Sequence, residues 1–389
     1  MKRSPFLISH FSFLICIAML LSGCIDEYVA DVPSEDSDLL VVEGAICSSQ
    51  LNKFILSRSQ PVNAAYHPRM VTDAKVSVRG SDGSEYVTQA ADGYYTCSID
   101  TLYPDVSYYL HIETDGEVYE SDPQKPIPTE KIAELDVIQE TPESNIDILV
   151  TPDAPFNPDK VNYYSWTYDE TWEVYPDYTT VIYFDTKKLA PVYDPHQFPE
   201  RGWKDATGST ILVGTSMSYE GQHIRKVKLY DISRNDERMY HKYSGLVHQR
   251  AITKAEYEYE LARRQASSEM GGLFTPLPSA LPTNIHCLTS NKRVIGFVGC
   301  SLSVGEYRFF LKPQDFSIEF PQNKDTRRWL DDPSMDDCVK MVEMGMYLCE
   351  WIDALRSPDG IFQTAWAWAY QLDVRVRGAY VEKPNFWED

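Results

Sequence analysis

Short alternating strands separated by Asp-Gly turns constrain the first third of the chain more than any other feature. Between residues 39 and 121, short segments rich in Val, Ile, Tyr and Thr are divided by turns such as those at 80–84 and 115–116. Asp-Gly supplies the positive φ that tight hairpin turns require, and a turn every eight to twelve residues is typical of sandwiches. We therefore expect an immunoglobulin-like antiparallel β-sandwich over residues 38–130. The expected strands are 39–46, 53–59, 74–78, 85–89, 94–99, 107–114 and 117–121.

The remaining residues, 131–389, predict a larger and less regular β-rich domain. One helix is expected near 253–270, beginning at a capping box of Thr253 and Glu256 and ending at Gly271-Gly272. The fold class is therefore mainly β, with one or two helices and no repeat of solenoid or propeller period. Its expected strands are 145–152, 162–175, 293–302 and 306–312.

The first 37 residues predict a targeting and anchoring segment rather than a folded element. Residues 1–23 combine Lys2 and Arg3 with an interrupted apolar run that is too short for a membrane span, as in a signal peptide. Leu21-Ser22-Gly23-Cys24 is the pattern of a bacterial lipoprotein box, so we expect Cys24 to carry lipid; the alternative is an ordinary leader whose cysteine forms a disulfide. Residues 24–37 form an acidic tether. Several acyl chains would hold the protein on the outer membrane, and the acidic run favours its outer face.

The charge of the chain excludes one class of partner. Without residues 1–23, 34 basic side chains face 58 acidic ones, and such a surface repels phosphate backbones. We therefore expect no nucleic-acid partner.

Six cysteines follow Cys24, an even number that suggests disulfides in an exported protein. Order along the chain favours a bond between Cys47 and Cys97. Apolar residues from Cys338 to Ile352 recur at helical spacing, with Gly345 on the same face. One unbroken helix would separate Cys338 and Cys349 by about 16 Å along its axis, too far for a disulfide. We favour the helix.

Aromatic residues beside carboxylates offer one candidate ligand site. Trp166, Tyr168 and Trp172 fall on one face of the strand 162–175, interrupted by Glu170. Such a row could stack on glycan rings or contact a peptide, and paired carboxylates could hydrolyse glycosides. The alternative is that this aromatic face belongs to the core. In residues 365–374, Trp366, Trp368 and Tyr370 also alternate with small residues, a pattern typical of tryptophans packed inward.

Motifs for reactive or metal-binding chemistry are absent from the sequence. It has no zinc-protease motif, nucleophile elbow, phosphate loop or Cys-x-x-Cys, so we expect no catalytic residue, metal or cofactor. His241 and His248 have no nearby ligand pattern. The acidic run 331–338 lacks the spacing of a calcium loop and suits a helix start.

Five blocks in the second domain resemble a known family. They are YYSWTYDETWEV, HQRAITKAEYEYE, GGLFTPLPSALPTNI, RVIGFVGCSLSVGEYRFF and RVRGAYVEKPNFW. With VVEGAI near the start, their order resembles the Bacteroidota lipoproteins grouped as domain of unknown function 4249, over essentially the whole mature chain. Relatives often carry two cysteines where this sequence has Gln371 and Val374, so that disulfide is not expected. The resemblance implies a surface lipoprotein that often accompanies a TonB-dependent transporter, and no established reaction.

Three functions remain open at this point. The favoured one is a non-catalytic binding or accessory module of a TonB-dependent nutrient-uptake system, with a glycan or peptide as its ligand. The alternatives are a surface hydrolase of glycans or peptides, and an adhesin or structural surface protein.

Overall fold

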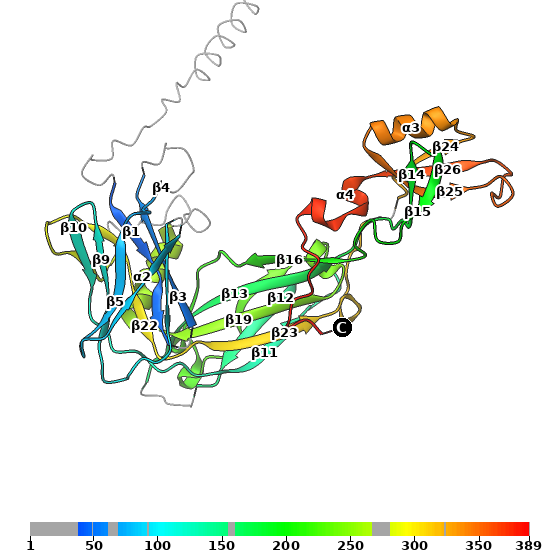
Figure 1. Cartoon of the computed structure of the whole chain (residues 1–389). Helices are drawn as coiled ribbons and strands as arrows, with labels where there is room; N and C mark the ends of the chain where they lie inside the picture. Colours follow the sequence, from blue (N-terminus) through cyan, green and yellow to red (C-terminus); the bar gives the residue numbers. More distant parts are fainter. Residues whose placement is uncertain are drawn as a thin grey trace, which may run out of the picture.

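The computed structural model describes residues 38–388 except 49, 61–68, 92, 155–159, 267–280 and 323. The predicted leader, Cys24, the acidic tether and Gly271-Gly272 therefore lie outside the described residues. Figure 1 shows two β-layered bodies in contact and a smaller lobe, containing α3 and β24–β26, that extends beyond the second. The predicted mainly β fold class, with an immunoglobulin-like sandwich first, is confirmed.

The first sandwich encloses one apolar core between two sheets, with fully buried Phe54, Tyr95 and Leu110 at its centre. One sheet orders β21 (Val294–Gly296), β1 (Leu40–Glu43), β3 (Gln50–Arg58), β8 (Tyr94–Ile99) and β7 (Gln89–Ala91), with β4 (Arg69–Met70) beside β3. The other orders β20 (Ile285–Cys287), β10 (Glu117–Ser121), β9 (Tyr108–Thr114), β5 (Lys75–Gly80) and β6 (Glu85–Val87). A short parallel pair, β2 (Ala45–Cys47) and β22 (Gly299–Ser301), adjoins them.

Three strands of this sandwich come from far along the chain. β20, β21 and β22 lie between residues 285 and 301, and β21 runs parallel to β1. Ile285, Val294 and Val298 enter the same core as Phe54. The sandwich is thus larger than the predicted unit 38–130, because a later segment returns to complete it.

The second sandwich packs two antiparallel sheets on another core. One sheet orders β11 (Ile132–Ile138), β12 (Ile146–Pro152) and β18 (Val227–Ile232). The other orders β16 (Gly202–Thr207), β13 (Tyr163–Val174), β19 (Tyr243–Ala251) and β23 (Gly305–Leu311), and β17 (Leu212–Thr215) also pairs with β13. Short 3-10 turns complete the structure: η2 (Ser216–Ser218), η3 (Glu220–Gln222), η4 (Glu237–Met239), η5 (Pro313–Asp315) and η6 (Val374–Arg377).

The distal lobe, defined here as residues 178–201 and 324–373, is built on a small sheet of its own. Its strands are β24 (Arg328–Asp331), β26 (Gln363–Trp368) and β25 (Met346–Ile352), with a hairpin of β14 (Ile182–Asp185) and β15 (Ala190–Tyr193). α3 (Met335–Glu343) covers one face, where Cys338, Met341 and Trp366 are buried together. The predicted inward packing therefore holds for Trp366 but not for Trp368, which is 39% exposed, or for Tyr370, which lies in α4 (Ala369–Leu372).

The predicted single helix through Cys338 and Cys349 is wrong. α3 ends at Glu343, and Gly345 takes a left-handed φ of 84° while its N–H bonds to the Val342 carbonyl. Glycine is favoured in this position after a helix because it has no Cβ to clash. The chain then reverses into β25, so the apolar residues at helical spacing are divided between a helix and a strand.

The predicted disulfide between Cys47 and Cys97 is not formed. Cys47 lies in β2 opposite Ser301, whereas Cys97 lies in β8 opposite Asn52. In the described part of the chain the six cysteines form no disulfide. Within the same residues, no helix is long and apolar enough to cross a membrane.

Candidate functional site

A cavity of about 610 Å³ lies where the two sandwiches meet the helix α2 (Lys254–Ala266). Its walls come from β1–β3 of the first sandwich, from β13, β19 and the segment 208–212 of the second, and from one face of α2. A large cavity with several converging polar groups is the default binding-site hypothesis for a structure of unknown function.

A buried ion pair joins the elements at this cavity. Arg250 of β19 binds the Glu256 carboxylate of α2, and Arg250 Nη1 also donates to Ser301 Oγ of β22 at 3.4 Å. Ser301 Oγ in turn donates to the Ala251 carbonyl at 3.0 Å. Because Ser301 belongs to the first sandwich and Arg250 to the second, the hydrogen bond between Arg250 and Ser301 connects the two bodies.

The ion pair between Arg250 and Glu256 explains why only one of the two hydrogen bonds of the predicted capping box is present. The Glu256 N–H donates to Thr253 Oγ1 at 3.1 Å, as predicted, and the helix begins there. The Glu256 carboxylate, however, turns to Arg250 and lies against the Cα of Gly299, where any Cβ would collide with it. Glu256, which the sequence indicates only as a helix-capping residue, therefore also contacts Arg250 of β19 and Gly299 of β22.

Further charges on α2 lie along the cavity. Arg263 is 3.0 Å from Glu260 and 3.4 Å from Glu43 of β1. Burial raises the pKa of Glu260 above its ordinary value, because a partly buried carboxylate loses hydration that favours its charged form.

A histidine between two carboxylates forms another part of the wall. His248 Nε2 is 3.1 Å from Asp169 Oδ2 of β13, and His248 Nδ1 is 3.3 Å from Glu306 Oε1 of β23. The hydrogen bond to Asp169 raises the pKa of His248, and the same bond lowers the pKa of Asp169. Sequence inspection missed this arrangement because the antiparallel register, and no local spacing, brings the three strands together. His241 lies apart, with its ring tilted by 41° against that of Tyr175 and the ring centroids 4.4 Å apart.

The predicted aromatic ligand face of β13 is buried in the core. Trp166, Tyr168 and Trp172 are 1%, 8% and 8% exposed, and Tyr168 stacks on Tyr230 with ring centroids 3.8 Å apart. This corrects the predicted ligand-binding role of that face and supports the alternative that it packs inside. Of the three, only Trp166 borders the cavity, and its Nε1 donates to Gln249 Oε1 at 2.9 Å.

Glu170 can stay within that core because two partners satisfy its carboxylate. Arg238 binds it at 2.6 Å, and the Tyr243 hydroxyl donates to it at 2.8 Å. A buried charge is tolerated when it is paired and hydrogen-bonded in this way, so the acid in the aromatic row is a paired core residue.

In the acidic run 331–338, residues from Ser334 onward start a helix, as expected, while Asp331 ends β24. Ser334 caps α3 and Asp337 completes a capping box with it. Across the described residues, no group of three or more His, Cys, Asp or Glu side chains is arranged to hold a metal.

Several charged side chains that line the cavity are paired with a side chain of opposite charge in the same wall. Arg250 faces Glu256, Arg263 faces Glu260, and His248 faces Asp169. Such a site presents oriented donors and acceptors without a large local field, which suits a polar ligand with little net charge.

A family model described as a domain of unknown function (DUF4249) matches residues 25–306. No curated protein matches the sequence. Among solved structures, the chain is similar to the FN1–FN3 domains of chicken CNTN1, at 11% identity and a TM-score of 0.15, covering 54% of this chain and 60% of that one. It is also similar to a point mutant of Salmonella alpha-2-macroglobulin, at 14% identity and a TM-score of 0.17, covering 59% of this chain and 14% of that one.

Proposed function

Because the chain belongs to the family described as a domain of unknown function (DUF4249), we propose that it is a cell-surface outer-membrane lipoprotein of a Bacteroidota-type envelope. In this proposal it acts as a non-catalytic binding or accessory module of a TonB-dependent nutrient-uptake system. The lipobox ending at Cys24 and the acidic residues after it support the anchor and its outward face.

The observation that carries the binding role is the cavity between the sandwiches. Its lining converges from both sandwiches and from α2, and Arg250, Glu256, Glu260 and Arg263 are paired within the wall. A site assembled from both bodies is sensitive to how they dock, which suits a module that reports an occupied ligand site to a neighbouring transporter.

Co-purification tests the accessory role. The full-length lipoprotein, extracted from native membranes in a mild detergent, is expected to bring down a TonB-dependent barrel. A Cys24→Ser variant is expected to leave the membrane fraction and to lose both labelled palmitate and the barrel. A monomer without partner under these conditions would contradict the proposal.

Growth on single carbon sources tests the cavity. Thr210 is an exposed residue at its rim, so Thr210→Trp should narrow the entrance without touching the core. Thr101→Trp places the same bulk on an exposed position that does not line the cavity. We expect the first variant, and not the second, to impair growth on at least one nutrient in a deletion strain.

A second candidate, a surface glycan hydrolase, is favoured by one observation. Glu260 and Asp169 both line the cavity, and their surroundings shift the two pKa values in opposite directions, which is the pattern of an acid and a base in one site. Turnover in a screen of polysaccharides, abolished by Glu260→Gln, would support it. A blank screen over polysaccharide and peptide libraries would eliminate it.

A further inference from the structure

The distal lobe exposes far more large apolar side chains than its size predicts. Ten of the 22 exposed large hydrophobic residues of the described chain belong to it, although it holds less than a quarter of the residues. A concentration of exposed apolar side chains in one lobe directs the search for a binding site to it.

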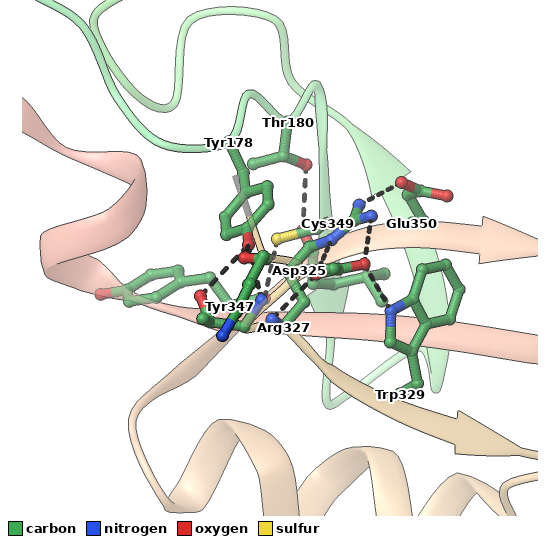
Figure 2. Close-up of polar contacts among 11 residues, drawn as sticks. Tyr178, Thr180, Asp325, Arg327, Trp329, Tyr347, Cys349 and Glu350 are labelled. Carbon is green, nitrogen blue, oxygen red and sulfur yellow. Dashed lines mark hydrogen bonds and ion pairs between the residues drawn. The ribbon is translucent and has the colours of Figure 1, made fainter. Parts of the chain in front are cut away.

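An arginine held between two aromatic rings organises one face of the lobe. The Arg327 guanidinium carbon is 4.8 Å from the Tyr178 ring centroid and 4.9 Å from that of Trp329. Asp325 accepts from Arg327 Nε at 2.9 Å and from Nη2 at 2.8 Å, and Glu350 binds Nη1. Figure 2 shows Arg327 enclosed by these four side chains. The positive charge of Arg327 is therefore compensated by Asp325 and Glu350 within the cluster.

Trp329 is fixed in place while much of its ring stays accessible. Its Nε1 donates to Asp325 Oδ2 at 2.8 Å, and Arg327 lies over its ring, yet the residue is 38% exposed. An aromatic side chain that is already immobilised loses little conformational entropy when a ligand stacks on it.

A second aromatic residue lies on the same face of the sheet. Trp329 is opposite Ala365 and Tyr347 is opposite Ala367, two alternate positions of the central strand β26. Tyr347 is 37% exposed and meets the edge of Phe198 at 5.1 Å. Strand spacing and rise place the two backbones roughly 12 Å apart, so together they can contact an extended ligand.

The surrounding groups indicate what kind of ligand fits. The side chains of Asp325 and Glu350 are each 40% exposed beside the rings. Each Asp325 oxygen already accepts two hydrogen bonds, from Arg327 and Trp329, whereas Glu350 is bound to Arg327 through Oε1, so Glu350 Oε2 is the oxygen that can accept a hydroxyl. Residues 324–373 carry ten acidic and five basic side chains, which disfavours anions. Apolar ring faces next to a hydroxyl acceptor suit the C–H face and the hydroxyl edge of a sugar.

We propose that Trp329, Tyr347 and Glu350 form a binding site for an uncharged oligosaccharide, with Asp325 holding the Trp329 ring in position. The site is separate from the cavity between the sandwiches, so this inference and the proposed function can fail independently. Glycan recognition here needs no conformational change, because the hydrogen bonds of Asp325 already set the position of Trp329.

Titration of the detergent-solubilised full-length protein tests this site. The probes are the hexaoses of cellulose, amylose, mannan and laminarin, with oligogalacturonate as an anionic comparison, followed by tryptophan fluorescence and saturation-transfer NMR. We expect at least one neutral hexaose to bind, the galacturonate to bind more weakly, and Trp329→Ala to weaken binding at least 10-fold.

Matched variants separate the site from general effects. Trp368→Ala removes a tryptophan of equal exposure outside the cluster, and it should leave affinity within twofold. Trp329→Phe retains a stacking ring and should lose less affinity than Trp329→Ala, while thermal melts check that each variant folds. A panel with no bound neutral hexaose, or binding that Trp329→Ala leaves unchanged, overturns the proposal. So does crosslinking at position 329 that captures a protein partner while no hexaose competes with it.

Discussion

Arg250 carries a largely buried charge, and the Glu256 carboxylate is the ion that compensates it. Its side chain is 17% exposed and that of Glu256 is 4% exposed. Removing one partner of such a pair leaves the other as a buried, uncompensated charge, which costs about 3–5 kcal/mol. We expect Arg250→Met to lower the free energy of unfolding by that amount in urea titrations.

The double variant is the control for this prediction. Arg250→Met with Glu256→Leu removes both charges, and replacing a whole buried pair by apolar residues is often close to neutral. We therefore expect the double variant to be more stable than the single one. Equal destabilisation by both would show that packing, and not the unpaired charge, determines the loss.

His248 predicts a pH dependence of stability. Because the hydrogen bond to Asp169 raises the pKa of His248 in the folded state, its contribution is full below the unfolded pKa of about 6.5 and is lost as the pH rises through the folded pKa. Asp169 has a lowered pKa, so its contribution is lost only as the pH falls through that value. Glu306 and Arg308 also act on this pair electrostatically.

Melting temperatures measured between pH 6 and 9 check this prediction. The decline of the melting temperature across that interval should be shallower in His248→Gln than in the wild type. The effect should be small because the Asp169 side chain is 48% exposed. His196→Gln, at an exposed histidine, should keep the wild-type slope; a slope unchanged in His248→Gln would contradict the assignment.

Among the elements, the junction of α3 and β25 depends on one glycine. Gly345 has a φ of 84° and no atom within 4 Å of a built Cβ, so backbone strain alone opposes a side chain there. We expect Gly345→Ala to destabilise the protein by about 1–2 kcal/mol in thermal or chemical unfolding. Gly345→Asn should lose less, because asparagine tolerates the left-handed region; an alanine variant as stable as wild type would refute this reading.

The same junction shows which elements the sequence could predict. Hairpins with Asp-Gly turns were predictable because turn chemistry is local, and α2 because its cap is local. The helix through Cys338 and Cys349 was mispredicted because apolar residues at 3.6-residue spacing were read across Gly345, where the chain reverses. At the cavity, Arg250, His248 and Glu260 were not identified as a site because their convergence depends on strand register and sandwich docking.

At the scale of the whole molecule, the first sandwich is discontinuous in sequence. Ile285 of β20, Val294 of β21 and Val298, which lies between β21 and β22, contribute to its core although they follow α2 in the sequence. No local pattern in residues 38–130 indicates that β20, β21 and β22 are also needed, so the predicted unit 38–130 omitted them.

A fragment experiment follows from this topology. We expect a fragment of residues 38–130 not to unfold cooperatively, because its core lacks the side chains of β20 and β21 and two of its edges are unpaired. Joining residues 281–304 to it through a flexible linker should restore a cooperative thermal transition by circular dichroism. Cooperative unfolding of the shorter fragment at the temperature of the joined one would contradict the expectation.

The placement of β1 has a mechanical consequence. β1 is the first described strand after the acidic segment, and it is bonded on one side to β3 and on the other, in parallel, to β21. A pull applied through the N-terminal segment would load both rows of hydrogen bonds in shear, along the strand axis, so that they resist together. In a protein that is held at its N-terminus against flow, the tension would therefore act on the pairing of β1 with β21, which belongs to the later segment 285–301.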